Sequence, residues 1–156
     1  MSVMTGPQMT RPPRPGWPLS SVLPPMGALA TAPRTARMHL RDTLKEWGLP
    51  ELIEDGELIA SELVTNVVKR AHDPMTGRPV YVGDRLPVLQ FGLFSDRTVL
   101  LISVWDQFAD PPVRTVATAE DESGRGLMMV GRISASLDWY PVQGGKVVRA
   151  FLRAAA

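Results

Sequence analysis

The sequence predicts an α+β fold, a two-layer sandwich in which one mostly antiparallel sheet is covered on one face by about three helices. Two long stretches in the first half of the chain repeat their apolar residues with the period of an α-helix. The middle and the end contain short β-branched and aromatic runs joined by tight turns, a pattern typical of antiparallel hairpins. A chain of 156 residues suffices for one domain of this kind. Packing one sheet against helices on a single face is the economical way to bury both apolar surfaces.

The first half of the chain is expected to be mainly helical. Apolar residues recur every three or four positions after Pro33, which suits a first helical turn, and Gly48 would end this helix. Thr31 is expected to cap the same helix with its side chain. A second helix is expected over residues 51–71, with a wide apolar face that suits burial against a sheet. Before the first helix, residues 17–30 favour a short edge strand.

The middle and the end of the chain are expected to form the sheet. The expected strands are residues 80–82, 88–94, 98–105, 137–140 and 146–152. Residues 95–97 would join the central pair as a hairpin, and Gly144-Gly145 would join the last pair. Residues 107–123 follow neither period, so we expect a long loop of the kind that often closes over a site. A third helix is expected to start near Gly124 and to run to Ile133.

Composition excludes several classes of function. The chain has no cysteine, which rules out disulfide scaffolds, thiol nucleophiles and zinc–thiolate sites. The net charge of +1 offers no overall field that would attract nucleic acid. The sequence has no run of eighteen apolar residues, so no membrane-spanning helix is expected. A cytoplasmic protein is therefore expected. Prolines concentrate near the N-terminus, so residues 1–16 are expected to form a disordered tail before a domain over residues 17–156. A ligand for a proline-binding module is the alternative for that tail.

Glu62 and Asn66 are the first candidates for chemistry. They lie four residues apart on the second expected helix, so their side chains project from one face, one turn from each other. A carboxylate and an amide oxygen held in this way suit the orientation of a water molecule and the ligation of Mg²⁺. A solvated helix face is the simpler explanation, because glutamate and asparagine are common at this spacing.

Asp106 and a glycine-flanked turn are the other candidates. Asp106 directly follows a buried strand run and is placed to accept a hydrogen bond from a ligand, although a strand-ending aspartate explains it as well. Gly124 and Gly126 allow the backbone to approach an anion at the start of the third expected helix, whose amides and dipole favour negative charge. Arg125 adds a positive charge for phosphate oxygens. An ordinary capped helix start is the alternative for this turn.

Taken together and in order, these segments resemble the histidine kinase-like ATPase superfamily (the Bergerat fold), and specifically its small anti-sigma-factor serine/threonine kinase branch, found in actinobacteria. Residues 61–68, SELVTNVV, are similar to the N box of that family. Residues 104–106, followed by Pro111-Pro112, resemble its first glycine box, and residues 122–127 resemble its second. Residues 145–148 resemble its last strand. The likeness extends over nearly the whole chain apart from the tail.

The resemblance implies a role for each candidate residue. Glu62 would be the general base that activates an attacking hydroxyl or water, and Asn66 would ligate the Mg²⁺ that bridges the phosphates. Asp106 would accept a hydrogen bond from the amino group of adenine. The phosphates would be held, beneath the closing loop, by Gly124, Arg125 and Gly126. The implied cofactors are ATP and Mg²⁺, and the implied chemistry is phosphoryl transfer to a serine or threonine, which depends mainly on positioning and charge stabilisation.

The resemblance also implies a regulator of transcription. Its partners would be a sigma factor, an antagonist protein that it phosphorylates, or both, without direct contact to nucleic acid or membrane. Relatives commonly dimerise, and the exposed face of the first helix is a candidate surface for a homodimer. The alternative is a non-catalytic module of the same fold that sequesters a sigma factor or an antagonist. Hydrolysis of ATP without a protein acceptor is a third hypothesis.

The sequence departs from the family pattern at several positions. Asp106 is followed by Gln107 and Phe108, where the family has a glycine two residues after the aspartate. Arg70 stands where a histidine is common, and Val147 stands where a threonine hydroxyl often helps to bind the water next to adenine. These departures favour the non-catalytic alternative, whereas the intact carboxylate–amide pair on the second helix favours the kinase.

Overall fold

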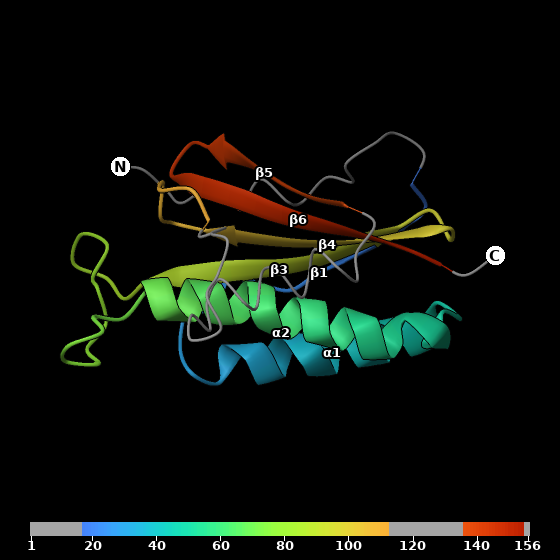
Figure 1. Ribbon diagram of the computed structural model, residues 1–156, viewed down its shortest axis with the longest axis horizontal. Helices are drawn as coiled ribbons and strands as arrows, with labels where there is room; N and C mark the ends of the chain where they lie inside the picture. The colour runs from blue at the N-terminus through green and yellow to red at the C-terminus, as the bar shows by residue number, and fades with distance from the viewer. Residues whose placement is uncertain (1–16, 113–135, 155–156) are drawn as a thin grey trace, which may run out of the picture.

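The computed structural model describes residues 17–112 and 136–154, which form two layers, a sheet and a pair of helices (Figure 1). Both helices cover the same face of the sheet, so the predicted α+β sandwich is confirmed for these residues. The tail, the greater part of the expected long loop and the expected third helix lie outside the described residues. No helix within the described ranges is long and apolar enough to span a membrane.

The sheet has six strands in the order β1-β3-β4-β6-β5, with the short β2 also paired to β3, and every described pair is antiparallel. The strands are β1 (Leu19–Val22), β2 (Met26–Gly27), β3 (Val88–Ser95), β4 (Val99–Asp106), β5 (Ser136–Val142) and β6 (Gly145–Arg153). The predicted hairpin is the pair β3–β4, and Arg97 turns between them with a positive φ of 80°. The predicted final pair is β5–β6, with Gly144 in the turn at φ 82°. Both hairpin predictions are confirmed.

The two helices lie side by side beneath the sheet (Figure 1). They are α1 (Ala32–Glu46) and α2 (Ile53–Arg70), and a short 3-10 helix, η2 (Pro50–Leu52), connects them. Gly48 ends α1 as predicted, because its φ of 72° is a backbone conformation that glycine adopts without strain. Thr31 occupies the N-cap position of α1 as predicted, but its side chain makes no capping hydrogen bond, and its backbone oxygen instead accepts one from the Thr35 hydroxyl.

The expected strand at residues 80–82 is also wrong. The chain between α2 and β3 contains two isolated bridges, one of them between Val82 and Arg85, and no strand. Gly77 and Gly83 adopt positive φ angles on either side of this run, which bends the backbone away from an extended path. Residues 80–82 have side chains that favour a strand, but no neighbouring strand lies beside them to pair with. Without such pairing they do not join the sheet.

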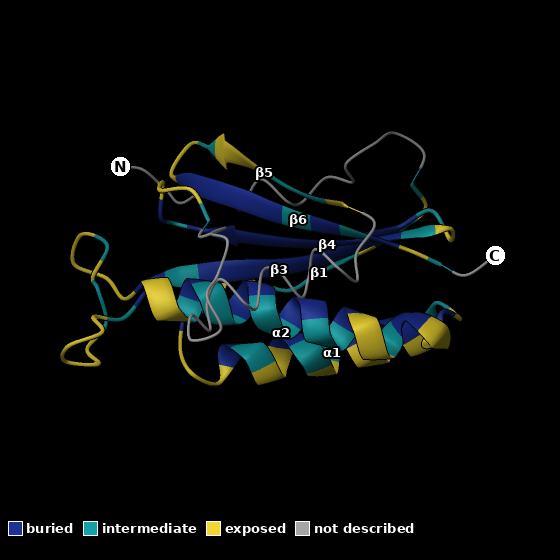
Figure 2. Cartoon of the chain, in the orientation of Figure 1, coloured by how far each residue is buried: buried dark blue, intermediate teal, exposed yellow. Residues whose placement is uncertain are grey.

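Side chains along the strands alternate between two apolar clusters, one on each face of the sheet. The face toward the helices carries the larger cluster, to which Phe91 and Val104 contribute from the sheet and Leu40 and Ile59 from the helices. The opposite face carries a smaller cluster of Phe94, Leu101, Trp105 and Val147. Figure 2 shows the buried central strands and the exposed outer faces of the helices. The alternation matters for function because it decides which residues at the strand ends face α2.

Candidate functional site

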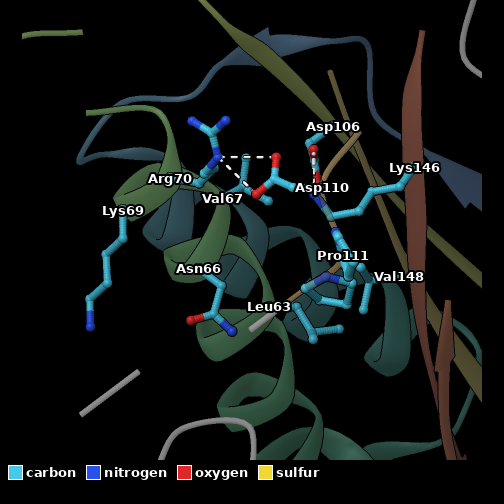
Figure 3. Close-up of a pocket in the computed structure, with 11 residues that line it drawn as sticks. Leu63, Asn66, Val67, Lys69, Arg70, Asp106, Asp110, Pro111, Lys146 and Val148 are labelled. Carbon is cyan, nitrogen blue, oxygen red and sulfur yellow. Dashed lines mark hydrogen bonds and ion pairs between the residues drawn. The ribbon is translucent and has the colours of Figure 1, made fainter. Parts of the chain in front are cut away.

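A pocket of about 230 Å³ lies where the second half of α2 meets the end of β4 and the start of β6 (Figure 3). Its apolar wall includes Leu63, Val67 and Val148. Its polar lining consists of Asn66, Lys69, Arg70, Asp106, Asp110 and Lys146. Apolar walls with a few convergent polar groups are typical of small-molecule sites. Three of the charged groups are cationic and two are anionic, so the lining suits an anionic ligand.

Asn66 lies on the helix wall of this pocket (Figure 3). The apolar stripe of α2 packs Leu63, Val64 and Val67 into the core, and this packing orients the helix so that Asn66 is half-buried at the pocket edge. Glu62 is half-buried one turn earlier on the same helix but is not among the residues that line the pocket. The structure thus places the amide in the pocket and the carboxylate beside it.

Asp106 lies at the inner end of the pocket, at the last position of β4. Because Val104 faces the helices, the alternation of the strand points Asp106 to the same side. Its carboxylate is 1% exposed, and Oδ1 accepts hydrogen bonds from the Phe108 backbone N–H at 2.8 Å and from Lys146 Nζ at 3.0 Å. Burial raises the pKa of Asp106 above its ordinary value, and the two hydrogen bonds and the Lys146 charge oppose that rise.

Lys146 is the most deeply buried of three polar lining residues that the sequence analysis missed, the others being Lys69 and Asp110. It pairs with Asp106 across the β4–β6 ladder, is only 5% exposed, and donates a second hydrogen bond to the Phe108 backbone oxygen at 2.9 Å. The sequence does contain a signal for it, because Lys146 is a charged residue in a run that otherwise has the pattern of a buried strand. Buried ammonium groups are rare and are retained where partners satisfy them.

Val147, in contrast, does not line the pocket. Its side chain is fully buried in the cluster on the opposite face of the sheet, against Phe94, Leu101 and Trp105. The residue that the resemblance set at the position of a threonine near adenine therefore lies on the face of the sheet away from the pocket. A shift of one residue along a strand moves a side chain to the other face, and the residue of β6 that faces the pocket there is Lys146.

The turn after Asp106 is ordered by the residues that depart from the family pattern. The Gln107 side chain accepts a hydrogen bond from the Val88 backbone N–H at 2.9 Å, and Phe108 is buried at 6% exposure in the helix-facing core. Gly145 allows β6 to approach this turn, because a Cβ at that position would clash with the Asp106 carbonyl oxygen. The larger residues at these two positions are therefore fixed by contacts to β3 and to the core, and neither lines the pocket.

A second ion pair lies at the rim. Arg70 Nε donates to both carboxylate oxygens of Asp110, at 3.1 and 3.0 Å (Figure 3), and the guanidinium carbon lies 4.3 Å from the centre of the Phe108 ring. The hydrogen bond from Arg70 lowers the pKa of Asp110 below its ordinary value. Both side chains are nearly half exposed, so solvent screens this pair more than the inner one.

The predicted phosphate-binding residues Gly124, Arg125 and Gly126 lie outside the described residues. Their roles stay predictions, as do those of Glu62, Asn66 and Asp106. Within the described ranges, no group of three or more histidine, aspartate or glutamate side chains is placed to hold a metal ion. The oxygen-bearing side chains on α2 nevertheless fit Mg²⁺, which proteins commonly bind through one or two side chains together with the phosphates of a nucleotide.

The described residues form an α+β domain with a pocket between α2, β4 and β6. A family model for the histidine kinase-like ATPase domain matches residues 26–152. This match spans most of the chain, and the chain belongs to that family. Membership implies ATP binding. The resemblance to the histidine kinase-like ATPase superfamily is thereby confirmed. No curated protein matches the sequence significantly.

The structure is also similar to a solved one, the crystal structure of the RsbU and RsbW domains of Rv1364c from Mycobacterium tuberculosis. The TM-score is 0.59 and the sequence identity is 21%. The similarity covers 87% of this chain and 32% of the other, so this chain spans about a third of that protein's length. At this level of identity the likeness supports the fold.

Proposed function

We propose that the chain binds Mg²⁺–ATP in the pocket between α2, β4 and β6 and transfers the γ-phosphoryl group to a serine or threonine of a partner protein. The observation that supports this most directly is the convergence of Asn66 and Asp106 on one pocket, although they lie on different elements. In the proposed arrangement the adenine amino group donates to the Asp106 carboxylate. Asn66 is the side chain that would hold Mg²⁺, which neutralises phosphate charge when bound.

Glu62 is the proposed general base. Its carboxylate takes the proton of the attacking hydroxyl while that oxygen forms a bond to the γ-phosphorus. The bond from the γ-phosphorus to the β–γ bridging oxygen breaks, and ADP leaves. The place of Glu62 one turn from Asn66 supports this role, because an acceptor hydroxyl near the γ-phosphate would then lie within reach of the carboxylate. Lys69 and Arg70 add positive charge on the same side of the pocket.

The proposed partners are an antagonist protein that carries the acceptor residue and a sigma factor that the chain sequesters. Family membership and a fold like that of a protein with an RsbW domain support a regulatory role of this kind. The described surface includes α1, which the sequence analysis named as a candidate dimer face.

A non-catalytic module is the second candidate function. Two observations favour it: the carboxylate expected to accept adenine is already paired with Lys146, and Glu62 does not line the pocket. A module of this kind would bind a nucleotide or a protein partner without transferring phosphate.

Calorimetric titration of the purified chain with ATP, with and without Mg²⁺, tests the binding step. Saturable binding that disappears without Mg²⁺ is the expected result. We expect Asn66→Ala to abolish the Mg²⁺-dependent binding and the neighbouring, half-buried Thr65→Ala to retain it. No binding at millimolar nucleotide would contradict the proposal, and retained affinity in Asn66→Ala would remove the metal role.

ADP formation under saturating Mg²⁺–ATP, with a partner protein present as the phosphoryl acceptor, tests the transfer step and separates the two candidate functions. Loss of a general base typically costs about a hundredfold or more in rate. We therefore expect Glu62→Ala to bind ATP as the wild type does and to lose turnover by at least that factor. Glu54→Ala, an exposed carboxylate on the same helix, is the matched control and should leave the rate unchanged. A wild type that binds ATP without turnover would favour the non-catalytic module.

A further inference from the structure

The inner end of the pocket presents a hydrogen-bond acceptor and a donor side by side. Asp106 and Lys146 are paired across β4 and β6, and the Nζ–Oδ1 distance is 3.0 Å. Both residues line the pocket, although each is almost fully buried. A ligand that reaches this end therefore meets a carboxylate and an ammonium group at the same time.

Among the described residues, both Asp106 and Lys146 keep hydrogen-bonding capacity beyond the pair itself. The two hydrogen bonds described for Asp106 both go to Oδ1, so Oδ2 takes part in neither. Lys146 has three N–H donors, and within the part of the chain that the structure describes Asp106 and the Phe108 backbone oxygen take two of them. A buried ammonium is costly unless its donors are satisfied, so the remaining donor favours a ligand that offers an acceptor.

This arrangement of donor and acceptor matches one edge of adenine. The six-membered ring of adenine carries the 6-amino group, a donor, directly beside N1, an acceptor. This edge is the part of the nucleotide farthest from the ribose and the phosphates. Because the phosphates must reach toward Asn66 and solvent, the base enters the pocket with this edge first.

We propose that Lys146 is a specificity-determining residue that donates a hydrogen bond directly to N1 of the adenine ring, beside the amino group that Asp106 accepts. This inference rests on the proposed binding of ATP in this pocket and adds to it a residue and an atom of the base. Hypoxanthine and guanine carry a carbonyl oxygen at C6 and a protonated N1. The carbonyl oxygen would then face the Asp106 carboxylate, and the N1–H would face the Lys146 ammonium group, so neither hydrogen bond would form. The same pair thus selects adenine by attraction and rejects 6-oxopurines by mismatch.

The test is a set of titrations of the full chain with ATP, 1-deaza-ATP and 7-deaza-ATP, all with Mg²⁺. Replacing N1 by carbon removes the proposed acceptor, whereas replacing N7 leaves it in place. A hydrogen bond from a charged donor is worth enough that its loss should weaken binding by about tenfold or more. We expect that loss with 1-deaza-ATP and an affinity close to that of ATP with 7-deaza-ATP.

The variant Lys146→Met assigns the effect to the side chain. Methionine is similar in length and has no donor, so the variant should bind ATP and 1-deaza-ATP equally. The wild-type titrations stand on their own if the variant does not fold. Equal binding of ATP and 1-deaza-ATP by the wild type would overturn the role of Lys146 alone, as would a folded variant that still discriminates. Failure of all three nucleotides to bind would instead overturn the proposed function, and this inference with it.

Discussion

Two ion pairs line one pocket, and they differ in what surrounds them. Lys146 and Asp106 join neighbouring strands at the inner end, with side chains 6% and 1% exposed. Arg70 and Asp110 join the end of α2 to the segment after β4, with side chains 45% and 47% exposed. The N···O distance is 3.0 Å in both pairs. Distance alone therefore says little about what each pair contributes.

The difference in burial separates a fixed end of the pocket from an adjustable rim. Opening the inner pair would leave two charges in a poorly solvated place, which is costly. Opening the rim pair exchanges one screened contact for water and costs little. The inner pair thus holds the end of the pocket in one arrangement, whereas the rim pair can rearrange when a ligand enters.

The largest expected effect follows from breaking the inner pair. Lys146→Met leaves Asp106 buried without its ammonium partner, so we expect the free energy of unfolding to fall by about 3–5 kcal/mol. Urea denaturation at neutral pH measures this change. The double variant Asp106→Asn with Lys146→Met removes both charges and should recover most of the loss. A single variant that loses less than about 1 kcal/mol would mean that the pair is solvated in solution.

The pH dependence of stability distinguishes the two carboxylates by sign. Asp106 has a raised pKa in the folded protein, so the stability it contributes is present below the unfolded value of about 3.9 and is lost as pH rises through the folded pKa. Asp110 has a lowered pKa, so its contribution is present above the unfolded value and is lost as pH falls through the folded pKa.

Unfolding curves between about pH 2 and pH 7 for the wild type, Asp106→Asn and Asp110→Asn test these opposite signs. Relative to the wild type, Asp106→Asn should gain stability as pH rises above about 4, because it lacks a carboxyl that is costly to ionise. Asp110→Asn should lose stability over the same rise, because it lacks the ionised partner of Arg70. Two difference curves of the same sign would contradict the contrast between inner end and rim.

The sequence predicted the elements whose signal is local. Asn66 and Asp106, which the motif order named as candidates, line one pocket, and the hairpins followed from short turns between apolar runs. The failed strand at residues 80–82 shows the limit of propensity, since a β-branched run forms a strand only where a partner lies beside it. Thr31 shows the same limit for a cap, because a capping residue type does not guarantee the capping geometry.

The two ion pairs could not be predicted from the sequence for a related reason. Each joins residues 40 positions apart, and each depends on a packing relation that no local pattern encodes. Lys146 faces Asp106 only because β6 pairs with β4 in one particular register. A register one residue different would have turned Val147 toward the pocket and Lys146 away, which is the assignment that the family resemblance suggested.

The smallest expected effect concerns the rim pair. Arg70→Ala should lower the free energy of unfolding by about 0.2–1 kcal/mol, as exposed pairs typically do, and high salt should remove much of that difference. Arg41→Ala is a matched control, because Arg41 forms an exposed pair of the same kind with Glu57, away from the pocket. Both variants should lose similar stability in urea denaturation.

Nucleotide affinity then separates these two exposed arginines. Only Arg70 lines the pocket, and it adds positive charge next to the proposed phosphate position. We expect Arg70→Ala to weaken Mg²⁺–ATP binding several-fold, more at low salt than at high salt, and Arg41→Ala to leave it unchanged. Equal affinities for both variants would show that the rim pair only supports the wall of the pocket. Tighter binding by Arg70→Ala would show that the pair with Asp110 must open before the nucleotide enters, which makes the rim a barrier to binding.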